Sequence, residues 1–329
     1  MSDIEVIGLG ALNIDHLYRV ERIIDDGEAV IEEAKSFPGG SAANTIYGLA
    51  RLGVKTGFAG VVGDDNEGRI LLEDFEKVGV DTSRIRVKRG VNSGSVLCLS
   101  DSLGKRSLYV LPGANNLLTI DDLELSDIKR ASILHLSSFV DNRQFEVLLK
   151  LIGNLDRSVK ISFSPGALYA SRGLKSLKPI LAKTYLLFIN EREIQELTGK
   201  DFTAGAETCL EQGCHIVVVT LGEGKELQVG KETGHRTVTA VSYIRDAESE
   251  YTVELEREGV VFDADTTGAG DAFAAGFLYG LLNGKGLEEC GHLGDIVAQF
   301  SITKVGARQG LPTLNELSQR YHELYNQQL

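Results

Sequence analysis

The chain has few cysteines, no long apolar run and no excess of basic residues, and each absence excludes a class of protein. None of its four cysteines stands in a Cys-x-x-Cys pair, so zinc and a disulfide framework are not expected, and buried free thiols are the simpler interpretation. No uninterrupted apolar stretch approaches the ~20 residues that cross a bilayer. The opening residues MSDIEVIGLG also lack a basic region and a cleavage site. We therefore expect a soluble, cytoplasmic protein that does not bind a membrane.

The charge balance is acidic. Lys and Arg number 34 and Asp and Glu number 47, which gives a formal net charge of -13. A sequence-independent nucleic-acid binder needs a basic face, so nucleic acid is not expected as a partner. A small anionic substrate is still compatible with this charge, because backbone amides can build a local anion site inside an acidic protein.

Two common nucleotide-binding motifs are also missing. The sequence contains no G-x-x-x-x-G-K-[ST], which excludes a P-loop enzyme. In GLGALN, residues 8–13, Asn13 stands where the dinucleotide fingerprint has its third glycine. This difference disfavours a Rossmann dehydrogenase.

The sequence does contain short β-branched runs that alternate with helical patterns. The 329 residues can bury a sizeable core, and no repeat, low-complexity tract or linker divides the chain. Continuous apolar strands separated by helices predict a parallel sheet covered on both faces, in a single α/β domain over residues 1–329. The expected strands are 4–10, 133–138, 159–164, 185–190 and 216–222, and the expected helices include 41–53, 68–80 and 192–199.

Two regions break this alternation. Residues 29–37 and the two runs within 95–112 have the pattern of strands without intervening helices, and the two runs flank a turn at 101–104. Such strands suggest a small lid over the active edge, drawn from about 13–37 and 92–113. The acidic stretch 246–258 is interpreted as a solvated surface region. In the helix at 41–53, Ser41 is the expected N-cap.

The stretch DTTGAGD, residues 265–271, joins glycines, a carboxylate and the start of a helix. Apolar residues at helical spacing follow it, so a helix is expected to begin near Ala269. The first amides of a helix have no intrahelical partner, and glycines there allow an anion to approach closely. Gly268, Ala269 and Gly270 can therefore cradle phosphate oxygens, and Asp271 can act as a general base for a hydroxyl. On these residues alone, an aspartate that merely favours the helix dipole after a tight turn is an equal alternative.

Two segments that occur in this order, PGGSAANTIYGLARLG at 38–53 and DTTGAGDAFAAGF at 265–277, closely resemble the signatures of the ribokinase (PfkB) family of small-molecule kinases. Shorter matching pieces lie between them, at 62–83, 112–118 and 190–199. The resemblance implies a ribokinase-like three-layer α/β/α fold with a mostly parallel central sheet and a small β-strand lid, which in many members also forms a dimer contact. It implies transfer of the γ-phosphate of ATP, with Mg²⁺, to a hydroxymethyl oxygen of a sugar or similar alcohol. Asp271 is then the base and Gly268–Gly270 the anion hole.

The resemblance also assigns residues to the nucleotide, namely Asn190, Glu193, Thr220, Gly222 and Gly224. Asn190 and Glu193 match the family's Asn-x-x-Glu motif, in which Glu193 helps to hold Mg²⁺, commonly through water. The alternative is a plain helix start with a surface glutamate. The segment TLGEGKE, residues 220–226, resembles a loop that follows a strand and borders the nucleotide phosphates. This chain departs from the family there, because Lys225 stands where a second glycine is usual, and its side chain is long enough to reach a phosphate.

On the acceptor side, the resemblance implies a set of five residues, Asn13, Asp15, Gly39, Gly40 and Asn44. A turn residue is the alternative for Asp15. Ribokinases usually carry a Lys where Ser41 stands and a Glu where Ser137 and Ser138 stand, so two charged groups that bind polyol hydroxyls are missing. This departure weakens a plain ribose kinase and admits a less polar or larger acceptor, such as a nucleoside.

A monovalent cation is a further expectation. Asp265, Thr267 and the segment SITKVGARQG, residues 301–310, resemble the loop beside the anion hole that binds K⁺ in several members. Three functions are open at this point: an ATP-dependent sugar kinase, a nucleoside kinase with the same machinery, and a catalytically silent ligand-binding protein. The expected partners are ATP, a sugar or nucleoside, and a second copy of the chain bound through the lid.

Overall fold

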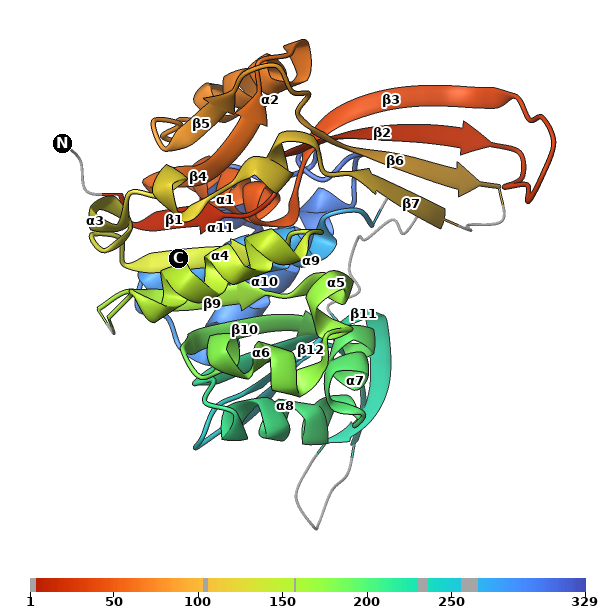
Figure 1. The fold of residues 1–329 in the computed structure, drawn as a ribbon. Helices are drawn as coiled ribbons and strands as arrows, with labels where there is room; N and C mark the ends of the chain where they lie inside the picture. The colour runs from red at the N-terminus through yellow and green to blue at the C-terminus, as the bar shows by residue number, and fades with distance from the viewer. Residues whose placement is uncertain (1–3, 103–105, 157, 230–235, 256–265) are drawn as a thin grey trace.

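The computed structural model describes residues 4–102, 106–156, 158–229, 236–255 and 266–329. These residues form a large sheet with helices on both faces and a smaller sheet that extends away from it (Figure 1). The arrangement is the three-layer α/β fold that the sequence predicts. Within the described ranges, no helix combines the length and the apolar character that crossing a bilayer requires.

The large sheet contains nine strands: β1 (Val6–Leu9), β4 (Thr56–Gly63), β5 (Ile85–Lys88), β8 (Ile133–Ser137), β9 (Lys160–Ser164), β10 (Thr184–Asn190), β11 (Ile216–Val229), β12 (Arg236–Arg245) and β13 (Glu250–Glu254). Their order is β13-β12-β11-β10-β9-β8-β1-β4-β5, and every pairing from β11 to β5 is parallel. All residues of β4 are buried, as expected for a strand covered on both faces. The five predicted strands are all present, and the sheet is mostly parallel as predicted.

The helices are α1 (Ser41–Arg51), α2 (Asn66–Lys77), α3 (Leu125–Ile128), α4 (Asn142–Gly153), α5 (Gly166–Ala170), α6 (Gly173–Leu181), α7 (Glu191–Thr198), α8 (Phe202–Glu211), α9 (Ala269–Leu282), α10 (Leu287–Ser301) and α11 (Leu314–Tyr325), with 3₁₀ helices η1 (Gly113–Leu117) and η2 (Ile120–Asp122). One face of the sheet packs against α4 and α6–α8, and the other packs against α1, α2, α9 and α10 (Figure 1). The core therefore lies in two layers on either side of the sheet. The four cysteines are buried and free, as predicted.

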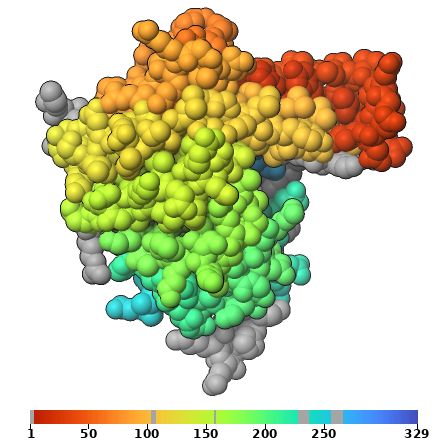
Figure 2. Space-filling model, viewed as in Figure 1, coloured from red at the N-terminus to blue at the C-terminus, as the bar shows by residue number. Residues whose placement is uncertain are grey.

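The smaller sheet contains β2 (Asn13–Val20), β3 (Ile31–Gly39), β6 (Gly94–Asp101) and β7 (Arg106–Leu111), in the order β3-β2-β6-β7. Its strands come from the regions where the sequence predicts strands without helices. Figure 2 shows the sheet projecting from the body of the molecule. Large apolar side chains on this projection are exposed, namely Ile31, Leu108, Tyr109 and Leu111.

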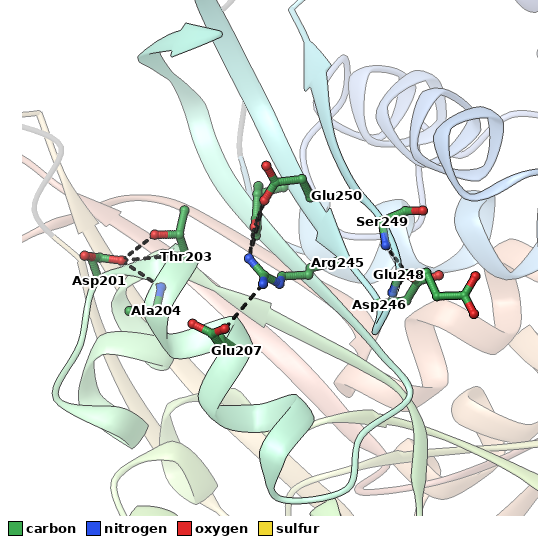
Figure 3. Close-up of polar contacts among 10 residues, drawn as sticks. Asp201, Thr203, Ala204, Glu207, Arg245, Asp246, Glu248, Ser249 and Glu250 are labelled. Carbon is green, nitrogen blue, oxygen red and sulfur yellow. Dashed lines mark hydrogen bonds and ion pairs between the residues drawn. The ribbon is translucent and has the colours of Figure 1, made fainter. Parts of the chain in front are cut away.

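The interpretation of residues 246–258 as a solvated surface region agrees with the exposed and half-buried side chains of most of its described part, but it missed a strand. Glu250–Glu254 form β13 at the edge of the large sheet, and Val253 on this strand is buried. Asp246 accepts hydrogen bonds from the N–H groups of Glu248 and Ser249 in the turn before β13 (Figure 3). The acidic composition concealed the alternating pattern of a strand, in which Tyr251 and Val253 pack against the core. Residues 256–258 lie outside the described residues.

Candidate active site

The helix α9 begins at the predicted residue, Ala269, directly after a glycine that the turn requires. Gly268 has a φ of 79°, and a Cβ on it would lie 2.4 Å from the Cβ of Ala307, so a side chain is excluded on both grounds. The first ladder bond of α9 runs from the N–H of Ala272 to the carbonyl of Gly268 (2.9 Å). The N–H of Gly270 precedes that bond, and a Cβ on Gly270 would meet no atom of the described residues within 4 Å. Among the described residues, the helix start thus combines space beside Gly270 with an N–H group that precedes the first ladder bond, as an anion site needs.

Asp271 stands in the first turn of α9 and is held by two side-chain donors from α1. The hydroxyl of Ser41 donates to Oδ1 at 2.7 Å, and Nδ2 of Asn44 donates to Oδ2 at 2.9 Å. Thr45 also donates to the backbone carbonyl of Asp271 at 3.2 Å. These contacts join residues more than two hundred positions apart and fix the carboxylate beside the anion space.

The prediction that Ser41 caps α1 is wrong. The N-cap is Gly40, with a φ of 102°, and a Cβ there would lie 2.1 Å from the carbonyl oxygen of Ala11. Since the chain turns at this glycine, Ser41 becomes the first helical residue and its hydroxyl is free to bond Asp271. The residue that replaces the family's usual lysine therefore contacts the predicted base.

The environment of Asp271 makes its carboxyl group a weaker acid than usual. Burial raises its pKa from 3.8 to about 6, against the hydrogen bonds from Ser41 and Asn44 and the positive charge of Arg308, while the charge of Glu193 adds to the increase. A general base is most effective when its pKa lies near the working pH. Asp271 therefore combines the position and the basicity that the predicted role requires.

The predicted acceptor residues meet at the base of the smaller sheet. Asn13 begins β2 and pairs with Gly39, the last residue of β3. Nδ2 of Asn115 donates to Oδ1 of Asn13 at 3.0 Å, which fixes the orientation of the Asn13 amide. The carboxylate of Asp15 lies so close to Gly39 that a Cβ there would be 2.1 Å from its Oδ2. Asn44 differs from the rest of this set, because its NH₂ group faces Asp271.

Arg308 joins these elements and was not identified from the sequence. Its guanidinium pairs with Asp74 on α2 (2.8 Å) and donates to Oδ1 of Asn44 (2.9 Å) and to the carbonyl of Gly39 (3.1 Å). It is only 5% exposed. The partners are distant in the sequence, so spacing offered no signal, although the residue lies in the segment 301–310 that the family resemblance singled out.

The predicted nucleotide residues meet where β10 ends beside the middle of β11. Asn190 on β10 is in register with Thr220 on β11. The expectation that a loop follows Thr220 is wrong, because β11 continues to Val229 and its pairing with β12 shifts between Thr220 and Lys225. The irregular stretch contains Gly222 (φ 65°) and Gly224 (φ 106°), and positive φ at both positions explains the choice of glycine. The glycines therefore form a bulge that lifts backbone away from the sheet.

A cavity of about 300 Å³ lies between this bulge and the start of α9. Gly222 and Ala269 are among its lining residues, and its apolar side chains are those of Val241, Leu255, Ala298 and Ile302. Asp295 and Gln299 add polar groups, and Nε2 of Gln299 donates to Asp295 at 2.7 Å. A pocket with mostly apolar walls and a few polar groups is typical of a small-molecule site.

The predicted Mg²⁺ residues form a capping box at the start of α7. The N–H of Glu193 donates to Oδ1 of Asn190 (2.8 Å), and the N–H of Asn190 donates to Oε2 of Glu193 (3.2 Å). This geometry agrees with the plain helix start that was the alternative. Among the described residues no cluster of three His, Cys, Asp or Glu side chains could hold a metal. Glu193 is a single carboxylate, and its charge acts on Asp271. One carboxylate nevertheless suits Mg²⁺, because this ion keeps several water ligands and substrate phosphates supply the rest of its coordination.

Three other predicted residues have different outcomes. Lys225 forms an ion pair with Glu191, next to Asn190. Thr267 lies in the turn before α9, and Asp265 lies outside the described residues.

The N–H of Ala269 donates to the carbonyl of Thr266 at 3.2 Å. Of the three predicted anion-hole residues, Ala269 therefore has a bonded amide, whereas a Cβ on Gly270 would contact no described atom within 4 Å.

Comparison with known proteins extends these observations. Residues 1–314 match the model of the pfkB family carbohydrate kinases. A relative from Archaeoglobus fulgidus, named an uncharacterized sugar kinase, is 40% identical over 266 residues, which are 80% of this chain and 98% of the relative. An ATP-dependent ribose-1-phosphate kinase from Halopiger xanaduensis is 28% identical over 96% of this chain and 97% of its own length. The ribokinase structure from Thermotoga maritima has a TM-score of 0.77 and 26% identity, covering 95% of this chain and 98% of that one.

The structural similarity to ribokinase and the order of the sheet show that the chain has the ribokinase-like α/β fold, which confirms the predicted architecture. The chain belongs to the pfkB family of carbohydrate kinases, enzymes that transfer phosphate to a hydroxyl group. Further relatives carry the names of ribokinases and of nucleoside kinases alike. The family is therefore confirmed at the level of a sugar or nucleoside kinase, and the roles of individual residues are still predictions.

Proposed function

We propose that the chain transfers the γ-phosphate of ATP to a primary hydroxyl of a sugar, with Asp271 as the general base. The observation that carries the proposal is the geometry of Asp271, whose carboxylate is fixed by two donors beside a helix start that has room for an anion. The elevated pKa of about 6 supports the same role. An assay of ADP release with Mg·ATP and a panel of acceptors tests the proposal.

In the proposed reaction, Asn13 and Asp15 hold hydroxyl groups of the acceptor at the base of the smaller sheet, and the reacting hydroxyl donates to Asp271. As the acceptor oxygen bonds the γ-phosphorus, the bond from that phosphorus to the β–γ bridging oxygen breaks and ADP leaves. Asp271 takes the proton, and the backbone amides at Gly268–Gly270 stabilise the charge on the transferring oxygens. Glu193 would hold Mg²⁺ through water, and the ion would neutralise charge on the phosphates.

The cavity between the β11 bulge and α9 is the proposed nucleoside site of ATP. Its volume of about 300 Å³ is at the lower end of the range for small-molecule pockets, and its lining includes Ala269, one of the proposed anion-hole residues. Gly222 and Gly224, which have positive φ in the bulge, would let the backbone approach the phosphates. Thr220 and Asn190, which are paired in register beside them, are also proposed to contact the nucleotide. Relatives crystallised with ADP and with ATP and ribose support ATP as the donor.

A nucleoside is the second candidate acceptor. The observation that favours it is that neutral serines stand where ribokinases usually carry a Lys and a Glu. Ser41 donates to Asp271, and Ser137 accepts from the N–H of Ala42. A panel of pentoses, hexoses, keto-deoxy acids and nucleosides separates the two acceptors by their kcat/KM values. If no acceptor gives ADP while ligands still bind, the chain is a silent binding protein, the third function that the sequence leaves open.

The rate should depend on pH through the ionisation of Asp271. With a pKa of about 6, the base is ionised above that pH and protonated below it, so kcat/KM should rise tenfold per pH unit up to about pH 6 and then level off. Initial rates measured with saturating Mg·ATP from about pH 4 to 8 check this dependence. A rate that stays constant through pH 6 and declines only near pH 4 would contradict the raised pKa.

The smaller sheet is the proposed lid and the proposed dimer contact. Leu108 is 61% exposed on β7, and exposed apolar groups together with open strand edges favour association. Leu108→Glu should therefore convert a dimer into a monomer without unfolding the chain, as measured by light scattering and circular dichroism. Leu168→Glu, at an exposed leucine on α5, is the matched control and should leave the mass unchanged. A wild-type mass for Leu108→Glu would refute this contact.

The proposal includes K⁺ beside the anion hole. The contact of Ala307 with Gly268 places the segment 301–310 against the start of α9, where backbone carbonyls could hold the ion, with Thr267 in the adjoining turn. Rates that are equal in K⁺, Na⁺ and Tris buffers would remove K⁺ from the account.

A further inference from the structure

Arg308 makes contacts that the proposed reaction does not use. Its side chain is 2% exposed and its charge is matched by Asp74, which is 16% exposed. A buried ion pair of this kind is weak evidence for a contribution to stability, because the cost of desolvating two charges can exceed their attraction. The guanidinium also lies over the rings of Tyr47 and Phe75 and is acted on by the charge of Asp15. Its two further hydrogen bonds, to Asn44 and to Gly39, indicate a role in addition to charge pairing.

The contact with Asn44 decides how its amide is oriented. A guanidinium has donors and no acceptor, so the Asn44 atom that faces Nε of Arg308 must be Oδ1, as observed at 2.9 Å. The NH₂ group must then point the other way, where it donates to Oδ2 of Asp271. A donor at that position favours the ionised carboxylate over the protonated one. With the amide reversed, Asn44 would offer its oxygen to Asp271, which would then need to carry a proton.

We propose that Arg308 is a positioning residue that fixes the Asn44 amide so that its NH₂ group, and not its oxygen, faces Asp271. The inference rests on the proposed role of Asp271 as the base. Arg308 acts through Asn44, and its bond to the carbonyl of Gly39 joins the same arrangement to the end of β3. One buried cation thus aligns the base, the helix α1 and the root of the smaller sheet.

The test uses the full-length chain with Mg·ATP and the best acceptor of the panel. Arg308→Met should lower kcat by about 10–100-fold, the range expected for a misplaced base, and should move the acid limb of the pH profile to higher pH. Arg308→Lys keeps a donor without an acceptor and should restore much of kcat and the original limb. The charges that act on Asp271 are those of Arg308 and Glu193, so Glu193 is left unchanged in all variants.

Loss of folding is controlled by two further variants. Arg308→Met combined with Asp74→Asn removes both members of the ion pair, so no unpaired carboxylate is left buried, and it should still show the lowered kcat and the moved limb. Arg84→Met removes an arginine that is 13% exposed and bridges Asp81 and Asp127 away from the site, and it should keep the wild-type pH profile.

The outcomes separate this inference from the proposed function. A folded double variant with the wild-type limb, or with a lower kcat at every pH and no movement of the limb, would overturn the positioning role. Full activity of Asp271→Asn would instead overturn the base itself. Because the charge of Arg308 also acts on Asp271 directly, Arg308→Met is repeated in an Asn44→Ala background. A limb that moves as far there as in the wild-type background would assign the movement to the charge alone and overturn the positioning role. If Asp271→Asn is inactive and the movement is lost in the Asn44→Ala background, both stand.

Discussion

Asp271→Asn should be nearly inactive, with kcat lowered by about 10²–10⁴-fold, the usual contribution of a general base. Asparagine keeps the shape of aspartate and can keep both contacts. Its oxygen can accept from Asn44, and its NH₂ group can donate to the Ser41 hydroxyl, which then accepts a hydrogen bond instead of donating one. The variant therefore removes the proton acceptor and little else. ADP release with a saturating acceptor measures the loss, and acceptor affinity measured by calorimetry should be retained.

The same substitution should not destabilise the chain. The pKa of Asp271 is about 6 in the folded chain, above its ordinary 3.8, so the folded state binds the proton more tightly than the unfolded state does. Ionisation then disfavours folding, by an amount that is zero below about pH 3.8, grows between pH 3.8 and 6, and reaches at most about 3 kcal/mol above pH 6. Asp271→Asn removes this cost, so its Tm at pH 8 should equal or exceed that of the wild type. A variant that is inactive because it is unfolded would not test the base.

Gly270→Ala should lower activity strongly and slightly increase stability, a combination that simple damage to the fold does not produce. Alanine favours a helix over glycine by about 0.5–1 kcal/mol, and a Cβ at this position meets nothing within 4 Å. The Cα–Cβ bond of a helical residue points toward the helix N-terminus, which is where the transferring phosphoryl group is proposed to bind. The methyl group would keep the phosphoryl group from the backbone amides, so kcat/KM should fall about 10²-fold or more.

Gly153→Ala is the matched control for this prediction. Gly153 is the last residue of α4, and a Cβ there also meets nothing within 4 Å. Both variants add one methyl group to open space on a helix, so both should keep or raise Tm in thermal unfolding. Only Gly270→Ala should lose activity. Equal activity of the two variants would mean that the start of α9 does not bind the phosphoryl group.

Features set by local sequence were predicted well. The start of α9 follows from glycines before an apolar helical pattern, and the parallel strands follow from continuous β-branched runs, because both signals lie within a few neighbouring residues. The failures arose where distant segments decide the outcome. Ser41 lost its capping role because Gly40 packs against Ala11, and β13 was missed because its pairing with β12 outweighs its acidic composition.

The candidate site shows the same division. The family resemblance named Asp271, Gly270 and Asn44, but it gave no reason to connect Asn44 with the base. The link through Arg308 depends on contacts between residues more than 200 positions apart, and one sequence holds no record of such pairs. Residue types can therefore suggest a base, whereas its orientation and its pKa become apparent only from the packed structure.

The account depends on a phosphoryl group bound at the start of α9 and passed to an alcohol that Asp271 deprotonates. A crystal structure with a non-hydrolysable ATP analogue and an acceptor tests this most directly. The account predicts a γ-phosphate oxygen at hydrogen-bond distance from the N–H of Gly270 and an acceptor hydroxyl about 2.6–3.2 Å from the Asp271 carboxylate. A terminal phosphate bound away from this turn, or an acceptor hydroxyl out of reach of Asp271, would contradict it.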